Sequence, residues 1–448
     1  MEKGAGDPDN RNDDGVRWSE SGKCHLEIFS IMGRTKVIIA GAGIGGLTSA
    51  LCLHEAGFDV QLYESAREIK PLGVGINLLP HAVRVLTHLG LQEELNQIAI
   101  ATSELAYYSK HGKKIWEEPR GKFAGYNWPQ FSLHRGTFQM LLLNQVKKRL
   151  GADKLKTGFF LQQAVNKNNS IEVHFSNKGS SEAVIVIEAD ALIAADGIHS
   201  ALRKQFYPGE GAPKFSGIIL HRGTTKAKPF LSGSSMIMAG SADKKFVAYP
   251  IQNFNDGTGD QLINWIADLR VSVEEDIMPQ DWNRRADKNK LLHEFRDWRF
   301  DWLDVPLLID NAEAIYEFPM SDRDPLPQWS LGHITLLGDA AHPMYPIGSN
   351  GASQAILDAE CLAESLKNND DISSALKQYE AIRLPATAKI VLQNRQMGPE
   401  QVMQIVEERA PNGFENLFDV ISQEELESIA ARYKQIAGFD KEALNKKQ

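Results

Sequence analysis

A strand that runs into a glycine-rich turn and then a helix constrains this sequence more than any other feature. Lys36–Ala40 has β-type character, and Leu47–Leu53 has apolar residues at helical spacing. The turn between them carries glycines where a nucleotide-binding turn needs them. Gly41 makes the tight turn, Gly43 lets a pyrophosphate approach bare backbone, and Gly46 lets the helix pack closely on the sheet.

The residues after the turn extend this pattern to a βαβ unit. The free N–H groups at the helix start, where Ile44 follows the turn, and the positive end of the helix dipole favour a phosphate. Val60–Tyr63 reads as the second strand, and Glu64 stands at its carboxyl end. An acid about 20 residues beyond the glycines hydrogen-bonds a ribose hydroxyl. Because an acid there disfavours a phosphorylated ribose, the unit is expected to hold FAD or NAD rather than NADP.

Composition argues against several classes of protein. The chain has 448 residues, 42% of them hydrophobic, enough for two domains or one large composite. Its net charge of −9, with acids and bases interspersed, argues against a nucleic-acid surface or a polybasic membrane patch. No apolar run approaches the roughly 20 residues that span a bilayer. The three cysteines are far apart without a CxxC, so we assign no disulfide framework and no metal. We expect a cytoplasmic protein without nucleic-acid partners.

The order of strand and helix patterns along the chain predicts an α/β fold with an inserted sheet. Residues 1–31 are polar and acidic and read as a disordered leader, with Met32 as an alternative start. From about residue 214, alternating strands replace strand–helix units, which is typical of a mainly antiparallel sheet. We therefore predict a Rossmann-like domain from residues 32–104, 131–213 and 318–384, a substrate domain from 105–130 and 214–317, and C-terminal helices over 385–448.

Two further motifs repeat the pattern of strand, glycine and acid. Ala189–Gly197 is a buried strand that ends in Asp196, and His333–Asp339 is another, followed by a loop and a helix from Gly351. That second helix N-terminus would stabilise negative charge on a flavin ring. Asp339 can accept hydrogen bonds from ribityl hydroxyls. A structural turn explains either motif alone, but it explains all three motifs together poorly.

These residues resemble the three fingerprints of the FAD-dependent aromatic hydroxylases, the single-component class built like p-hydroxybenzoate hydroxylase. The resemblance lies in Gly41–Glu64, in Asp196–Arg203 and in Gly338–Gly348, and it extends from about residue 35 to residue 385. Segments such as Pro71–Asn77 and Asp322–Pro327 look most like the branch that modifies phenazines. The resemblance implies a p-hydroxybenzoate hydroxylase-like fold for the FAD-binding domain.

The resemblance also implies which residues hold FAD. The glycine turn with Ile44 and Glu64 would hold the ADP half, and Asp196 is linked in this family to the use of both FAD and NAD(P)H. Arg135 would reach the pyrophosphate or ribityl region and Asp339 the ribityl chain. Gly351 and Ala352 would lie at the flavin ring.

The implied reaction is an aromatic hydroxylation. NAD(P)H would reduce FAD, O2 would form a flavin C4a-hydroperoxide, and oxygen would pass to an electron-rich aromatic or N-heteroaromatic acid. The sequence has no second GxGxxG, which fits a nicotinamide that visits the flavin transiently. The choice between NADH and NADPH, and between monomer and homodimer, stays open. Two alternatives remain: a flavin oxidase or dehydrogenase on the same fold, and a non-catalytic binding protein, against which the intact motifs argue.

Catalytic side chains are harder to predict. In related hydroxylases a histidine lies four residues before the tyrosine of a substrate-domain strand; here those positions hold Lys245 and Tyr249. Because lysines are mostly exposed, we expect Lys245 to point to solvent rather than to anchor a substrate carboxylate. Tyr249 is either a pocket residue or a core tyrosine, and Tyr345, on the flavin-side loop, is predicted to line the substrate pocket. His134 and His342 are expected to be structural.

Overall fold

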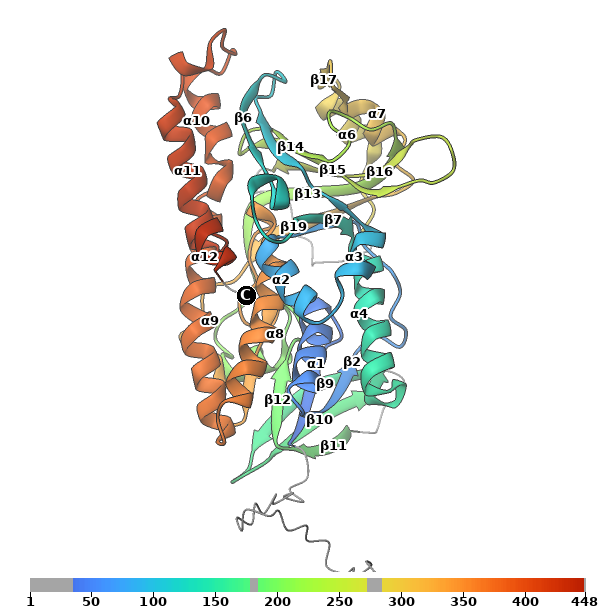
Figure 1. Ribbon diagram of the computed structural model, residues 1–448, viewed down its shortest axis with the longest axis vertical. Helices are drawn as coiled ribbons and strands as arrows, with labels where there is room; N and C mark the ends of the chain where they lie inside the picture. The colour runs from blue at the N-terminus through green and yellow to red at the C-terminus, as the bar shows by residue number, and fades with distance from the viewer. Residues whose placement is uncertain (1–34, 178–183, 272–283, 447–448) are drawn as a thin grey trace, which may run out of the picture. The chain divides into compact units, whose positions relative to one another are not determined.

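The structure, a computed structural model, describes residues 35–177, 184–271 and 284–446, and Figure 1 shows it as a ribbon. Residues 35–448 form one compact unit. The leader predicted over residues 1–31 lies outside the described residues. Within the described ranges, no helix is both long enough and apolar enough to cross a membrane.

The first sheet is the one that the glycine motif predicts. Its six strands lie in the order β20-β21-β12-β1-β2-β8. All neighbours pair in parallel except β20 and β21, which pair antiparallel. The strands are β20 (Ser330–Leu331), β21 (Ile334–Leu336), β12 (Ala191–Ala194), β1 (Lys36–Ala40), β2 (Asp59–Glu64) and β8 (Leu155–Thr157). Strand β1, buried from Val37 to Ala40, lies in the middle of the sheet, as its run of apolar residues predicts.

Helices and two small sheets surround this sheet. The helices are α1 (Ile44–Glu55), α2 (Pro80–His88), α3 (Gln92–Ile98), α4 (Arg135–Leu150), α5 (Ala201–Phe206), α8 (Gly351–Lys367) and α9 (Ile372–Arg395). One small sheet is β11 (Val184–Ala189), β10 (Ile171–Asn177) and β9 (Phe159–Asn166), and the other is β3 (Gly75–Leu78), β7 (Phe131–His134) and β4 (Ala99–Ala101). Helix α8 packs along α1, and both contribute to the largest apolar core (Figure 1).

The second large sheet has seven strands in the order β19-β13-β16-β15-β14-β5-β6. They are β19 (Ile315–Asp322), β13 (Lys214–Ala227), β16 (Gln261–Arg270), β15 (Lys244–Asn253), β14 (Ser235–Gly240), β5 (Glu104–Tyr108) and β6 (Lys114–Pro119). Every pairing is antiparallel except that of β14 with β5. The predicted mainly antiparallel sheet is therefore present, and a hairpin from residues 104–119 completes it.

Each face of the second sheet buries a core of its own. On one face lie α6 (Lys288–Phe295), α7 (Val305–Asp310) and the short pair β17 (Arg299–Phe300) and β18 (Leu303–Asp304). The other face meets α10 (Gln401–Arg409) and α11 (Gln423–Ile436), which are followed by α12 (Lys441–Asn445). The 3-10 turns are η1 (Gly121–Ala124), η2 (Ala152–Lys154), η3 (Gly338–Ala340), η4 (Ile347–Ser349), η5 (Gly398–Glu400) and η6 (Leu417–Asp419).

The C-terminal helices begin earlier than the sequence suggests. Helix α9 continues through Pro385 to Arg395, so the boundary predicted at residue 385 falls inside a helix. A proline in a helix removes one backbone hydrogen bond, and tertiary packing offsets that loss here. The division into two domains stays a proposal, since the described residues beyond Thr35 belong to one compact unit.

Candidate cofactor and substrate site

The carboxyl ends of four parallel strands meet at one edge of the six-stranded sheet. At this edge β1 ends at Ala40, β2 at Glu64, β12 at Ala194 and β21 at Leu336. Ligands of open α/β sheets bind outside such an edge, in the crevice between the loops that follow the strands. The sequence-predicted cofactor residues all lie on these loops or on the first turns of the neighbouring helices.

The glycine turn has the shape that a pyrophosphate-binding turn requires. Gly41 has φ +106°, and its N–H donates to Tyr63 O at 2.7 Å. A Cβ on Gly46 would lie 2.0 Å from the carbonyl oxygen of Gly41, so only glycine fits there. A Cβ on Gly43 would meet nothing within 4 Å. The backbone at Gly43 is thus open to an approaching group, beside the N-terminus of α1.

Glu64 ties the end of β2 to this turn. Its Oε2 accepts the backbone N–H of Ala42 at 2.8 Å, and its Oε1 accepts the N–H of Ala66 at 2.7 Å. Gln139 of α4 donates to the carbonyl oxygen of Ala42 at 2.8 Å from the other side. Ser65 Oγ also donates to Oε1 at 3.1 Å, so the remaining acceptor capacity of Glu64 for a ribose hydroxyl lies on Oε2.

Asp339 and Arg135 carry opposite charges and attract each other near this edge. Asp339 lies in η3, shortly after β21. It is exposed to solvent, but protein atoms lie around its carboxyl group. This enclosure raises the pKa of the Asp339 carboxyl, and His342 and Arg135 oppose the rise. Arg135 is the half-buried first residue of α4; desolvation lowers the pKa of its guanidinium, and Asp339 opposes that.

A second helix N-terminus lies beside the first. Gly351 and Ala352 open α8, and no side chain caps this helix. Gly348 and Ser349 before it have left-handed φ values of +67° and +56°. A Cβ on Gly45 of α1 would lie 3.3 Å from Ala355 Cβ, so the two helices approach closely near their N-termini. Uncapped N–H groups and two aligned dipoles favour a large anionic cofactor such as FAD, and the residues present therefore fit that group.

A buried acid fixes the loop that carries Asp339. Asp358 of α8 accepts the Gly338 N–H at 3.1 Å and pairs with His342 Nε2 at 2.5 Å and Arg383 Nε at 2.7 Å. Burial alone would raise the pKa of Asp358, but His342 and Arg383 outweigh it and lower the pKa to about 2. His342 thus helps to hold this loop through Nε2, while its Nδ1 is buried without a hydrogen-bond partner among the described residues. His134 is structural, since its Nδ1 accepts the Thr137 N–H at 3.3 Å and caps α4.

One carboxylate oxygen of Asp196 has a hydrogen-bond partner, and the other has none among the described residues. Its Oδ2 accepts the Ala201 N–H at 2.8 Å at the start of α5. Its Oδ1 is buried with no hydrogen-bond partner in the described part of the chain, and burial raises the pKa of this carboxyl. A buried acceptor without a partner is costly, so Oδ1 is the atom left for a ligand.

Tyr249 and Tyr345 approach the same face of the seven-stranded sheet. Tyr249 is buried, its hydroxyl bonds the Arg222 guanidinium, and burial raises its pKa to about 12. Tyr345 is half-buried and packs beside Leu220 and Ile218. Because side chains two residues apart on a strand point the same way, Leu220 and Arg222 share one face of β13. Arg222 also donates to Gly75 O at 3.2 Å, which joins the start of strand β3 to this face.

The expectation that Lys245 points to solvent is wrong. Only 8% of Lys245 is exposed, and its Nζ lies 2.9 Å from Asp268 Oδ2 and 2.5 Å from Glu400 Oε2. Both acids are buried, so their charge offsets the desolvation of the ammonium group and raises the pKa of Lys245. The partner Glu400 also accepts the backbone N–H of Gly348, at the start of the turn before α8. Lys245 therefore does not face solvent and has its carboxylate partners within the protein.

Sequence reasoning missed three residues that organise the site: Arg222, Asp358 and Glu400. Asp358 had a signal, since it is a lone acid on the otherwise apolar face of α8 that includes Ala355, Ile356 and Ala359. Such an acid needs a buried cation as partner. Arg222 and Glu400 had no local signal, because their partners lie far away in the sequence.

Comparisons with known proteins show the family to which this chain belongs. The model of a family described as the FAD binding domain matches residues 34–394. The phenazine 1,6-dicarboxylic acid hydroxylase PhzS of Lysobacter antibioticus is 46% identical over 364 residues, 81% of this chain and 89% of that protein. The 6-hydroxynicotinate 3-monooxygenase of Pseudomonas fluorescens is 30% identical over 368 residues, 79% of this chain and 89% of that protein. The crystal structure of Klebsiella pneumoniae HpxO with FAD and uric acid superposes with a TM-score of 0.70 at 22% identity, covering 91% of this chain and 97% of that one.

Proposed function

This chain belongs to the FAD-binding-domain family of flavoprotein aromatic hydroxylases, and from that membership we propose that it uses NAD(P)H and O2 to hydroxylate an aromatic or N-heteroaromatic acid. Its cofactor is FAD. The observation that carries the proposal is the strand edge at which the open Gly43 turn, Glu64, Asp339 and the uncapped start of α8 come together.

Within this class we propose a phenazine acid as substrate. The support is the 46% identity to a phenazine 1,6-dicarboxylic acid hydroxylase. The sequence segments that resemble the phenazine-modifying branch, whose named member is 5-methylphenazine-1-carboxylate 1-monooxygenase, point the same way. Quinoline and hydroxybenzoate acids are the next substrates to test, since other relatives act on 6-hydroxynicotinate and 3-hydroxybenzoate.

The proposed roles of the residues follow from their positions. When bound, FAD supplies the transfer of electrons from NAD(P)H and the activation of O2. The Gly43 turn and the α1 N-terminus would bind the pyrophosphate, and Glu64 the adenosine ribose. Asp339 and Arg135 would orient the ribityl chain. Gly351 and Ala352 would present backbone N–H groups to the flavin ring, where they stabilise negative charge.

No general base is assigned to this site. Lys245, at the position of the family's histidine, is committed to two acids, and the hydroxyl of Tyr249 bonds Arg222. We therefore propose that the substrate ring is electron-rich as bound and that the protein contributes orientation and exclusion of water. A flavin oxidase on the same fold is the alternative function.

The test is the oxidation of NADH and NADPH by the FAD-loaded protein, with phenazine, quinoline and hydroxybenzoate acids added in turn. Peroxide is assayed in parallel, and the product is identified by mass. We expect one class of acid to stimulate reductant oxidation, with little peroxide and a product heavier by one oxygen atom. Peroxide that equals the reductant consumed with every acid would contradict the proposal and favour the oxidase.

Tyr345 gives a first test of the substrate side. Replacement by alanine is expected to reduce kcat/KM about tenfold, because an aromatic wall of the pocket is lost, while the ratio of FAD to protein stays unchanged. The measurements are steady-state kinetics and the flavin absorbance of the purified variant. A variant that loses FAD but keeps its turnover per bound flavin would place Tyr345 at the cofactor instead.

A further inference from the structure

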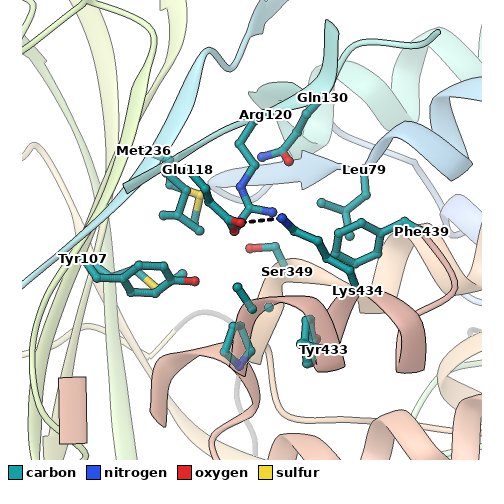
Figure 2. Close-up of a pocket in the computed structure, with 15 residues that line it drawn as sticks. Leu79, Tyr107, Glu118, Arg120, Gln130, Met236, Ser349, Tyr433, Lys434 and Phe439 are labelled. Atoms are coloured by element: carbon teal, nitrogen blue, oxygen red, sulfur yellow. Dashed lines mark hydrogen bonds and ion pairs between the residues drawn. The ribbon is translucent and has the colours of Figure 1, made fainter. Parts of the chain in front are cut away.

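A small cavity lies at the far end of the seven-stranded sheet, between that sheet, the turn before α8 and the C-terminal helix α11. Its lining is mainly apolar, with Leu79, Met236 and Met238 among the apolar residues, and a few polar side chains reach into it. Figure 2 shows its lining, which includes Tyr107 of β5, Arg120 after β6 and Gln130 before β7. Gly348 and Ser349 form the wall next to the start of α8, where the flavin ring is expected. The cavity measures about 20 Å³, room for one small group such as a water molecule or a carboxylate oxygen.

A buried acid with two cations lines this cavity. Glu118 pairs with Arg120 at 2.5 Å on one oxygen and with Lys434 at 2.5 Å on the other. Burial would raise the pKa of Glu118, but the two cations outweigh it and lower the pKa, so this acid stays ionised. Lys434 is partly exposed, and the nearby cluster of Lys245, Asp268 and Glu400 carries one net negative charge, so the charges in this region balance. The cavity therefore favours a ligand through hydrogen bonding rather than through net charge.

Three buried polar atoms in the same lining have no hydrogen-bond partner among the described residues. They are the hydroxyl of Tyr107, Nε of Arg120 and Oε1 of Gln130. The exposed fractions of these residues are 1%, 8% and 2%. Tyr107 and Arg120 can both donate to an acceptor placed between them, and each unmet buried donor costs about 1–3 kcal/mol. A ligand oxygen in the cavity would satisfy them.

We propose that this cavity is the subsite for a carboxylate of the aromatic acid substrate, with Tyr107 and Arg120 as its donors. The proposal rests on the function proposed above. The aromatic ring would lie outside the cavity, and one carboxylate oxygen would reach inward. Gln130 completes the lining and accepts a hydrogen bond from a ring substituent or from water.

The wall opposite the sheet comes from the end of the chain. Tyr433 and Lys434 of α11 and Phe439 line the cavity, and they follow the segment matched by the family's FAD-binding domain, residues 34–394. Polar contacts hold this wall in place: Tyr126 donates to the carbonyl oxygen of Phe439 at 2.7 Å, and Gln354 of α8 donates to that of Ala437 at 3.1 Å. The seven-stranded sheet, the turn before α8 and the C-terminal helices therefore all contribute to the subsite.

The test measures binding rather than turnover. The FAD-loaded protein is titrated with phenazine-1-carboxylate and with the neutral phenazine-1-carboxamide, and Kd is read from the flavin absorbance. We expect the wild-type protein to bind the acid at least tenfold more tightly than the amide. Tyr107→Phe and Arg120→Lys, which keeps the ion pair with Glu118, should weaken the acid about tenfold and leave the amide unchanged.

The matched control is Tyr108→Phe, the same substitution one residue along the same strand. Tyr108 points to the other face of the sheet, where it packs on Trp302 with ring centroids 4.2 Å apart. This control should bind the acid as the wild-type protein does. Equal affinity for acid and amide, or an unchanged preference in Tyr107→Phe, would overturn the subsite in favour of a buried water. The parallel assay of hydroxylation shows separately whether the proposed function holds, so the two failures are distinguishable.

Discussion

At the scale of single residues, two substitutions in the glycine turn can separate an effect on folding stability from an effect on cofactor binding. A methyl group on Gly46 would lie 2.0 Å from the Gly41 carbonyl oxygen, whereas one on Gly43 would meet open space. Gly46→Ala should therefore lower the free energy of unfolding by about 1–3 kcal/mol. Gly43→Ala should change it by less than about 0.5 kcal/mol, yet weaken FAD at least tenfold, because the methyl group takes the place of the pyrophosphate.

The measurements for this pair are urea unfolding of the FAD-free proteins and a fluorescence titration with FAD. The two variants act as controls for each other, since both add one methyl group within the same turn. A Gly43→Ala protein that binds FAD like the wild-type protein would show that the pyrophosphate does not approach this turn.

Lys245 offers a second test at this scale. Lys245→Met leaves Asp268 and Glu400 buried without their cation, and the loss of one partner of a buried ion pair costs about 3–5 kcal/mol. The neighbouring Lys244→Met is the control, because that lysine's contact with Glu294 is partly exposed and worth less than about 1 kcal/mol. Urea unfolding at pH 7 compares the two variants. The double variant Lys245→Met/Glu400→Gln should recover part of the loss, and equal effects of Lys244→Met and Lys245→Met would contradict the account.

At the scale of elements, Asp358 joins α8, α9 and the loop after β21. Its folded pKa of about 2 lies below the value near 3.9 of an unfolded aspartate. Its contribution of about 2–3 kcal/mol is therefore present above about pH 4 and is lost as the pH falls toward 2. Asp358→Asn should cost more free energy of unfolding at pH 6 than at pH 3, as measured by urea unfolding at both values. The exposed Asp310→Asn should show no such difference, and an equal cost of Asp358→Asn at both pH values would contradict the linkage.

The elements also show what a sequence can predict and what it cannot. The strand, turn and helix from Lys36 to Glu55 follow from local rules, because glycines and apolar spacing act over a few residues. The partnership of Lys245 with Glu400 depends on how the C-terminal turn η5 docks on β15. No local pattern carries that information, so the general rule that lysines are exposed gave the wrong expectation. Local patterns predicted which residues gather at the carboxyl edge of the first sheet, but they did not predict the buried charges that hold its loops.

At the scale of the whole molecule, residues 35–448 form a compact unit by themselves. A chain that begins at Thr35 is therefore expected to keep the FAD content and the Tm of the full chain within experimental error. A chain that begins at Gly41 lacks β1, the strand between β12 and β2 that is buried from Val37 to Ala40, and should not fold. Flavin absorbance and thermal unfolding compare the three proteins. Loss of FAD from the first truncation would show that residues 1–34 contribute to the cofactor site.

The C-terminal wall of the small cavity has a consequence for how such proteins diversify. The residues proposed to bind the nucleotide are distributed over the strands and helices of the first sheet, so few of them are expected to change without loss of FAD. Tyr433, Lys434 and Phe439 belong instead to the last stretch of the chain, beyond the segment matched by the family's FAD-binding domain. Exchange of this stretch between relatives would alter which acid is accepted, provided that the hydrogen bond from Tyr433 to Ile347 in the turn before α8 is kept. Evolution and protein engineering can both use a specificity element at this place in the chain.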